Sequence, residues 1–460
     1  MVVNSSGVTG LQWAIIWPPL SKLLTALLLQ ACFLTLPMKF AIVAVPALFA
    51  AALPAYSQTA PAAHIADCQK LLSSYRSLLL ESNPPDVATL QKWTESLTTE
   101  GNWADIDYTD QTLSNWKPLR HLDRVAQFYL ALNQPGTLLY HDAKTREAAR
   151  RSLHWWLLNK PKESQWYHLN ISVPRKMRDI ILLAGDELQG NERELAMKQL
   201  GQFKVGGTGA NLVWSADLAM HYAALRNDGV AVGEMAKKLA DEVKISDFEG
   251  IRDDWSFHQH GPRLQTFHYG QSYFSESTRI AWQLRDTRWA YPAQKIDLLS
   301  NLVLQGWRWQ LRGNMTVPST LDRAVSRAGS LKVNQQNNVR RLAHVDRKHA
   351  QELNAFAASM DTGQPAARGF KWFPRSDFAA YHTPKASFFL KTLSSRTNTT
   401  ESINNENQLG AQLNLGNQFI LKGNDEYVDL MGAWDWKRLP GVTWPEWASV
   451  SHPNAKQQET

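Results

Sequence analysis

The chain has 460 residues, of which 44% are hydrophobic and 20% are charged, with a net charge of +7. This composition excludes a disordered or collagen-like chain, and the length suggests about two or three domains. Two cysteines exclude a disulfide scaffold and an all-cysteine metal cluster. No long basic run accompanies the modest charge, which argues against nucleic-acid binding. The 19 tryptophans favour an enzyme or a binder of planar or polyhydroxylated ligands.

The N-terminal residues 1–57 are predicted to be an upstream extension plus a signal peptide. Within residues 38–57, Lys39 precedes an apolar run that ends in a small-x-small site at Ser57. This layout is typical of a secretory signal peptide. We therefore expect a secreted or periplasmic protein without a stable membrane partner. The alternative is a membrane anchor at residues 23–36, a run that is short against the roughly 20 residues of a span.

Residues 63–345 carry the periodicity of α-helices. Apolar side chains recur three and four positions apart, as they do at Val125, Phe128 and Leu132. Proline, glycine and asparagine separate the periodic stretches. The sequence has no fixed-period repeat of the kind that would predict a solenoid. Serial antiparallel helices of this kind predict a helical toroid or array. The expected helices cover residues 124–132, 145–158, 175–188, 191–204, 211–226, 232–244, 272–285 and 294–312.

The pattern changes after about residue 346. Short apolar segments lie at residues 387–393, 411–415, 418–422 and 426–431, and the later ones are separated by glycine–asparagine turns. They predict the start of an antiparallel β-domain over residues 346–460. Few strands cannot close a sandwich, so we expect this domain to be incomplete and the chain to be truncated.

Two segments combine aromatic or glycine residues with amides. In residues 165–175, Trp166 and Tyr167 lie beside amide and imidazole groups, a combination that suits sugar rings, although an aromatic core explains it equally well. In residues 206–211, a glycine-rich turn opens a helix. Asn211 would either meet a ligand there or cap the helix, and capping is the commoner use.

Two further segments carry titratable groups. His260 and Tyr269 could pair as proton-transfer groups. A zinc site is the rival interpretation, because His258 would lie on the same face of a strand as His260. The third interpretation is that these are structural loop histidines. No carboxylate or cysteine completes a zinc set. Arg323 and Arg327 share a face if their segment is helical, and two arginines form a fork for a carboxylate or sulfate. A solvated basic face is the alternative.

Taken together and in this order, the segments resemble polysaccharide lyase family 8, the chondroitin AC, hyaluronate and xanthan lyases. The resemblance extends from about Trp93 to Trp444. It implies an α+β multidomain fold, with an N-terminal incomplete α/α toroid followed by an antiparallel β-sheet domain. The matching stretches are residues 165–175, 208–211, 259–262 with Tyr269-Gly270, 323–327 and 404–407.

The resemblance also implies a reaction, the cleavage of a uronic-acid-containing glycosaminoglycan such as chondroitin or hyaluronan by β-elimination. Asn211 would neutralise the uronate carboxylate. Neutral His260, or Tyr269 with its pKa depressed by arginines, would take the C5 proton, and Tyr269 is suited to protonate the leaving oxygen. Arg323 would support Tyr269, and Glu406 would orient the site. The substrate-binding residues implied are Trp166, Tyr167, Arg327 and Asn407.

This reading needs no cofactor and no metal ion, and the sequence does not indicate a structural calcium ion. The expected partner is an acidic polysaccharide, and a monomer is expected. The aromatic block Gln165-Trp166-Tyr167 differs from the Asn-Trp-Trp that family members often carry, and the family usually continues beyond residue 460. A xanthan lyase, or a truncated carbohydrate-binding protein without catalysis, therefore remain alternatives.

Overall fold

The structure, a computed structural model, describes residues 59–82, 86–113, 115–162, 165–423, 425–429 and 432–443. The expected signal peptide over residues 38–57 lies outside these residues. Among the helices that are described, none combines the length and the apolar character that crossing a bilayer needs.

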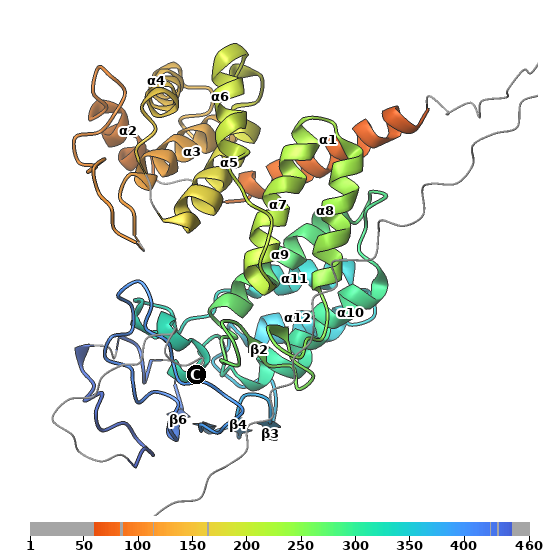
Figure 1. The fold of residues 1–460 in the computed structure, drawn as a ribbon, viewed down its shortest axis with the longest axis vertical. Coiled ribbons are helices and arrows are strands. Elements are labelled where there is room, and N and C mark those ends of the chain that lie inside the picture. The colour runs from red at the N-terminus through yellow and green to blue at the C-terminus, as the bar shows by residue number, and fades with distance from the viewer. Residues whose placement is uncertain are drawn as a thin grey trace, which may run out of the picture. The chain divides into compact units, whose positions relative to one another are not determined.

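Helices occupy the larger, N-terminal part of the described chain, and an antiparallel sheet follows them, as the sequence predicts (Figure 1). The α-helices are α1 (Thr59–Leu80), α2 (Val87–Glu95), α3 (Leu119–Asn133), α4 (Ala143–Asn159), α5 (Val173–Ala184), α6 (Gly190–Leu200), α7 (Gly209–Leu225), α8 (Gly229–Glu242), α9 (Tyr269–Leu284), α10 (Ala293–Asn301), α11 (Gln336–Val345) and α12 (Ala350–Ser359).

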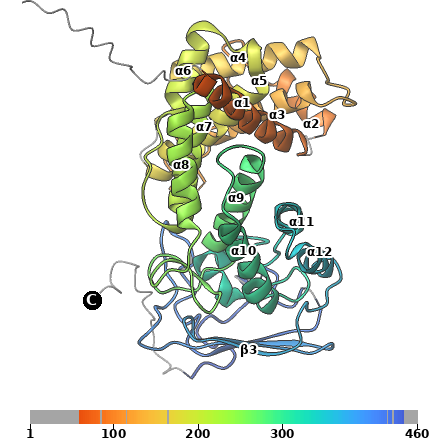
Figure 2. The ribbon, with the colours of Figure 1, turned by 90° about the vertical axis from the view of Figure 1, so that its right-hand side faces the viewer.

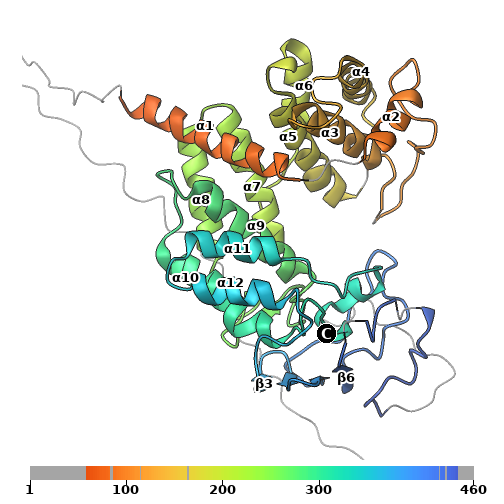
Figure 3. The ribbon, with the colours of Figure 1, turned by 180° about the vertical axis from the view of Figure 1, so that it is seen from behind.

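The helices pack in two neighbouring groups. Helices α2 to α6 contact one another, and α7 contacts α8 and α9, while α11 contacts α9 and α12 (Figures 1 and 3). Helix α7 also contacts α1, α5 and α6. Its sequence is apolar around most of the circumference, with Val213, Ala216, Leu218 and Met220 fully buried. A helix that is apolar all round is stable only when it is covered on all sides, and this places α7 at the centre of the helical region.

Two helices contain wider turns near their ends. A π-helical turn, His168–Ser172, runs directly into α5. The helix expected over residues 294–312 is divided into α10, a second π-helical turn (Leu302–Gly306) and a 3₁₀ turn (Trp307–Trp309). Gly306 allows the close approach there, because a Cβ at this position would lie 2.3 Å from the carbonyl oxygen of Trp255.

The sheet has four antiparallel strands in the order β3-β4-β5-β6. Figure 2 shows it nearly edge on, with β3 labelled. Phe389 pairs with Ala380 on one side and with Phe419 on the other. Phe373, Phe378, Phe389 and Phe419 are buried on the inner face, where His382 Nε2 lies 3.1 Å from the backbone oxygen of Trp309. The strands are β3 (Gly369–Phe373), β4 (Phe378–His382), β5 (Ser387–Lys391) and β6 (Asn417–Leu421).

Several sequence-based expectations for this region differ from the structure. Residues 411–415 form turns and no strand, because the Asn417 side chain takes the backbone N–H groups of Asn414 and Leu415. Residues 426–429 also form turns, and the Glu426 carboxylate accepts two backbone N–H groups there. The expected end of that strand, at residues 430–431, is outside the described residues. Strands β3 and β4 were not predicted. Helix α12 lies within the range that we assigned to the β-domain, which was expected to start at residue 346.

Candidate active site

His260 lies in a tight loop after a short strand pair, β1 (Gly250–Ile251) and β2 (Phe257–His258). Its φ is +56°, an uncommon value for a residue with a side chain, and Gly261 follows with φ +80°. Nδ1 of His260 lies 2.9 Å from Oε2 of Glu401. Since a carboxylate only accepts, Nδ1 of the neutral ring carries the hydrogen and Nε2 keeps its lone pair. The ring is 28% exposed, so Nε2 is available as a proton acceptor.

Tyr269 is the first residue of α9, directly beside His260. The two rings lie 4.8 Å apart between centroids. The next residue must be glycine, because a Cβ on Gly270 would lie 2.8 Å from the ring of Phe257 in β2. The Tyr-Gly pair therefore lets α9 begin against the strand that leads to His260, and this packing brings the imidazole and the phenol together.

Arg323 and Arg327 belong to a short 3₁₀ turn, Asp322–Ser326, and the residue after it. Nη2 of Arg323 donates to the Tyr269 hydroxyl at 2.7 Å. The same guanidinium binds Glu401 through Nη1 and Glu406 through Nε. Arg327 donates to both Glu406 oxygens, at 2.7 and 2.9 Å. The two arginines thus share Glu406, although their segment is a 3₁₀ turn and not the α-helix that we considered.

The acidic partners come from the irregular segment between β5 and β6. Glu401 is fully buried, and its backbone N–H donates to Asp322 Oδ1 at 3.0 Å. We expected Asn407 to contact substrate, but it is 1% exposed and its amide donates to the backbone oxygen of Glu401 at 3.1 Å. Burial removes Asn407 from the surface, so it would not reach a substrate. Its hydrogen bond instead holds the backbone of Glu401.

The electrostatics of this cluster follow from burial and from the arginines. Burial raises the pKa of the Tyr269 hydroxyl above its usual value, and Arg323 only partly offsets this effect. The depressed Tyr269 pKa that we considered is therefore wrong. Burial opposes ionisation of Glu401, but the hydrogen bond with His260 and the charge of Arg323 lower its pKa overall. Burial, together with the charge of Glu401, raises the pKa of Asp322 to about 7.

A row of aromatic rings connects Tyr269 to the predicted sugar-binding block. The ring of Trp214 lies 5.9 Å from Tyr269 and 5.5 Å from Tyr167, and Trp166 lies 5.9 Å from Tyr167. Trp166 is 52% exposed, while Trp214 is 7% exposed. The π-helical turn after Tyr167 and the first turns of α7 hold this row in place. It forms an apolar wall that opens to solvent at Trp166.

Asn211 lies in the first turn of α7, three positions before Trp214. Thr208 is the N-cap residue of this helix, so capping by Asn211, the commoner interpretation of the sequence, is wrong. Oδ1 of Asn211 is buried and has no hydrogen-bond partner in the described part of the chain. Residues three apart share a helix face, which puts Asn211 beside the aromatic wall. A buried amide oxygen without a partner is costly unless a ligand or water binds it.

The structure thus brings His260, Tyr269, Arg323, Arg327 and Glu406 into one connected cluster, as the resemblance implies. Sequence reasoning missed Glu401 and Trp214. Glu401 stands in a polar segment where nothing distinguishes it from Glu406, and Trp214 is one apolar residue among many in α7. The sequence offered one signal for each: Glu401 stands three residues before the Asn-rich stretch at 404–407, and Trp214 stands three residues after Asn211.

The rival zinc reading has no support in the geometry. His258 is 1% exposed and its Nε2 lies 2.8 Å from the Ser376 hydroxyl, while His260 faces Glu401. Across the described residues, no group of three or more His, Cys, Asp and Glu side chains is placed to hold a metal ion.

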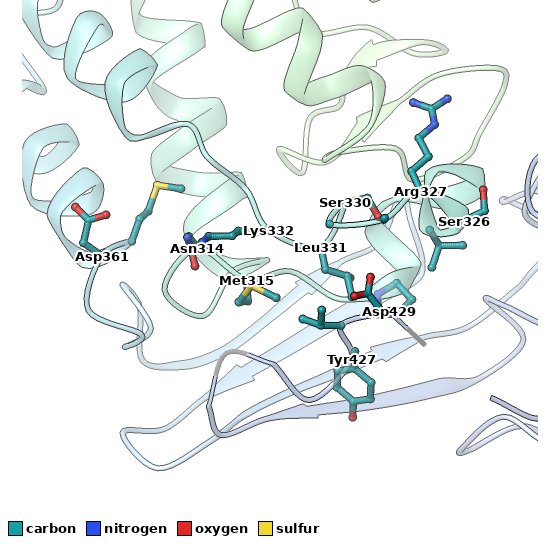
Figure 4. A pocket seen from close by; sticks show the side chains of 16 residues that line it. Asn314, Met315, Ser326, Arg327, Ser330, Leu331, Lys332, Asp361, Tyr427 and Asp429 are labelled. Carbon is teal, nitrogen blue, oxygen red and sulfur yellow. The ribbon is translucent and has the colours of Figure 1, made fainter. Parts of the chain in front are cut away.

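A cavity of about 600 Å³ adjoins this cluster at Arg327. Figure 4 shows Arg327 at one end and Asp361 at the other, with Lys332 and Tyr427 between them. Arg327 thus binds Glu406 and lies at the edge of this cavity, whose lining also contains Lys332, Asp361 and Asp429.

The chain is similar to known polysaccharide lyases in both its sequence and its fold. Residues 58–360 match the N-terminal alpha-helical domain of polysaccharide lyase family 8, and residues 368–460 match the super-sandwich domain of the same family. Chondroitinase-AC of Pedobacter heparinus is 29% identical over 370 residues, which cover 77% of this chain and 52% of that protein. Xanthan lyase of a Bacillus species is 22% identical over 446 residues, with 83% and 48% covered. The chain thus spans about half the length of these curated relatives.

A solved structure of a chondroitinase AC lyase, determined in complexes with oligosaccharides, has the same fold. It superposes with a TM-score of 0.75 at 25% identity, over 81% of this chain and 57% of the other. Two domain profiles of one family together cover most of the sequence, and the structural likeness agrees with them. The chain belongs to polysaccharide lyase family 8.

Proposed function

We propose that the chain is a carbon–oxygen lyase that cleaves chondroitin or hyaluronan by β-elimination and leaves an unsaturated uronate end. The observation that carries this proposal is the Tyr269 hydroxyl, which lies 2.7 Å from Arg323 and beside the ring of His260. The reaction removes one proton and delivers another, so it requires an acid and a base next to each other. Tyr269 and His260 are such a pair, and Arg323 holds the Tyr269 hydroxyl.

The first step concerns the acidity of the C5 proton. A uronate carboxylate is ionised at neutral pH, and its charge opposes the build-up of negative charge at C5. The Asn211 side chain is the group that would bind this carboxylate and stabilise the developing charge. The donor to the carboxylate is the Asn211 side-chain NH₂, and the buried Oδ1, which has no partner in the described residues, would accept from a sugar hydroxyl of the same substrate.

The second step is the proton transfer. Glu401 fixes the hydrogen of His260 on Nδ1, so Nε2 serves as the base. Tyr269 keeps its proton because burial raises its pKa, and it serves as the acid that protonates the leaving glycosidic oxygen. Arg323 directs the hydroxyl, and Glu406 together with Glu401 holds Arg323. In this scheme Arg323, Glu401 and Glu406 are positioning residues.

The remaining groups concern the substrate. Trp166 and Tyr167 offer an aromatic wall for sugar rings, and Arg327 offers a positive charge for the polyanion. The higher identity to Chondroitinase-AC than to xanthan lyase supports a glycosaminoglycan substrate. We also propose that the protein is exported, acts as a monomer and needs no cofactor. A panel of chondroitin sulfate, hyaluronan and xanthan, followed by ultraviolet absorbance of the unsaturated product, tests the substrate class.

The central test is Tyr269→Phe. We expect turnover to fall on the order of 10²–10⁴-fold, because the acid is removed, while polymer binding is retained. The matched control is Tyr291→Phe, which removes a buried hydroxyl that binds no described group. It should keep full activity. Unchanged turnover in Tyr269→Phe would contradict the assignment, and the absence of product from the unmodified chain on all three polymers would contradict the proposed activity.

A further inference from the structure

The proposed base and the proposed carboxylate-binding amide come from two different segments, and one side chain connects them. Glu249 directly precedes β1. Its Oε1 accepts the backbone N–H of Gly261 at 2.9 Å, and its Oε2 accepts the Gln259 side-chain amide at 2.7 Å. Oε2 also accepts the hydroxyl of Thr208. All three donors are neutral, so a carboxylate with its several lone pairs can accept from each of them.

One arm of this contact holds the start of α7. Thr208 is the N-cap residue of α7, and Gln259 Oε1 accepts the N–H of Ala210 at 3.3 Å. A Cβ at Gly209 would lie 2.3 Å from that same Oε1, so the helix start and Gln259 are in close contact. Asn211 follows within the same turn. Glu249 therefore acts on the position of Asn211 through Thr208 and Gln259.

The other arm holds the loop of His260. His260 and Gly261 both have positive φ, and such a backbone persists only when its surroundings hold it. The Gly261 N–H is fixed by Glu249, and the His260 carbonyl is fixed by Arg263. The Glu401 contact fixes the side chain but not this backbone turn. Glu249 thus joins the His260 turn to α7, together with the direct contact of Gln259 with Ala210.

We propose that Glu249 is a positioning residue, which sets the separation between Asn211 and His260 and thereby the geometry in which the carboxylate is bound while C5 loses its proton. This inference rests on the proposed function and adds a residue to it. Glu249 itself needs no contact with substrate. A misplacement of the order of 1 Å between two reacting groups lowers the rate far more than it lowers binding.

The test is Glu249→Gln in the full chain, with Thr208→Val as a second variant that removes only the α7 arm. The glutamine keeps the shape, but its NH₂ would face a donor, so one arm is released. We expect kcat to fall about 10–100-fold for Glu249→Gln and less for Thr208→Val, with KM changed by less than about threefold. Glu234→Gln on the exposed face of α8 is the matched control and should behave as the unmodified chain.

A second measurement is independent of turnover. Hydrogen exchange, followed by mass spectrometry on a peptide that covers residues 257–263, should become faster in Glu249→Gln, while the midpoint of urea unfolding stays within error. The reason is that a single amide oxygen must then serve the Gly261 N–H and the Gln259 amide, which two carboxylate oxygens serve separately in the unmodified chain. Unchanged exchange, or unchanged kcat in a chain whose unmodified form is active, overturns the inference. A fall in activity that is matched by a general loss of stability in both variants also overturns it. An inactive unmodified chain contradicts the proposed function instead.

Discussion

The helical region and the β-region contribute different chemical groups to the site. The helical region provides the groups that would exchange a proton, carry a positive charge or bind the uronate carboxylate. They are Asn211, His260, Tyr269, Arg323 and Arg327. The β-region provides the carboxylates of Glu401 and Glu406. The carboxylates hold the cations and the imidazole in place. The positions of His260 and of the two arginines therefore depend on the β-region, which supplies no proton-transfer group in the proposed scheme.

The two regions also differ in how they bury apolar surface. Helix α7 is covered on all sides by other helices. The sheet buries one face and exposes the other, where Phe370, Tyr381, Phe388 and Ile420 form a row across all four strands. Phe370 is 66% exposed and Phe388 is 41% exposed. Exposed apolar surface of this extent is unusual on a soluble protein and marks an interaction or aggregation surface.

The largest effect should come from removing the carboxylate that joins the regions. In Glu401→Gln, the His260 tautomer is no longer fixed and Arg323 loses a charged partner in a buried place. We expect kcat to fall on the order of 10²–10⁴-fold. The measurement is kcat and KM for the preferred polymer.

Glu406→Gln is the comparison for this prediction. Glu406 binds both arginines but not His260, so its loss should lower kcat less than the loss of Glu401 does. Equal effects of the two substitutions would show that the carboxylates act only as counter-charges, and that the His260 tautomer does not matter.

A smaller effect, on stability, should come from buried histidines in both regions. Burial lowers the pKa of His121, in α3, to about 3 and the pKa of His382, in β4, to about 4. The unfolded chain takes up these protons near a pKa of 6.5, so the free energy of unfolding is highest above that pH and decreases as the pH falls toward 3. Each histidine should contribute on the order of a few kcal/mol.

Urea unfolding at about pH 7 and about pH 5 measures this dependence. The double variant His121→Gln/His382→Gln, although less stable throughout, should lose less stability between the two pH values than the unmodified chain. The two single variants show which region is responsible for the loss. An identical loss in all four proteins would contradict the role of these histidines.

The smallest effect should come from the outer face of the sheet. Phe388→Thr removes an exposed ring whose centroid lies 6.2 Å from that of Tyr381, and we expect a change in stability below about 1 kcal/mol, with less aggregation in light scattering. Phe389→Thr, one residue further and 2% exposed, should instead destabilise the protein by about 3–5 kcal/mol. Similar losses for the two variants would show that the outer face is covered in solution.

Much of this arrangement could be predicted from the sequence. Periodicity located most helices to within a few residues, because amphipathic and apolar faces recur at fixed spacing. Two of the four strands were predicted, but residues 411–415 were taken for a strand. Their apolar residues resemble a strand locally, while the Asn417 side chain diverts the backbone N–H groups from any ladder.

The candidate site shows the same division. His260, Tyr269 and Arg323 could be named from their blocks, since each lies in a short recognisable motif, whereas Glu406 could be named only through the family resemblance. Glu401 could not be named, because its importance comes from full burial beside His260, 141 positions away in the chain. The direction of the Tyr269 pKa was also beyond reach, because it depends on whether burial or Arg323 dominates.

The sequence by itself determined the helical and β regions, the family and the residue types of the site, because these depend on local spacing and on short motifs. The tertiary structure alone decided which carboxylate meets His260, that Asn211 lies inside the first turn of α7 and not at its N-cap position, and that Asn407 is buried. The physical reason is that hydrogen-bond pairing, burial and pKa depend on neighbours in space, and the segments that meet here are separated by up to about two hundred residues along the chain.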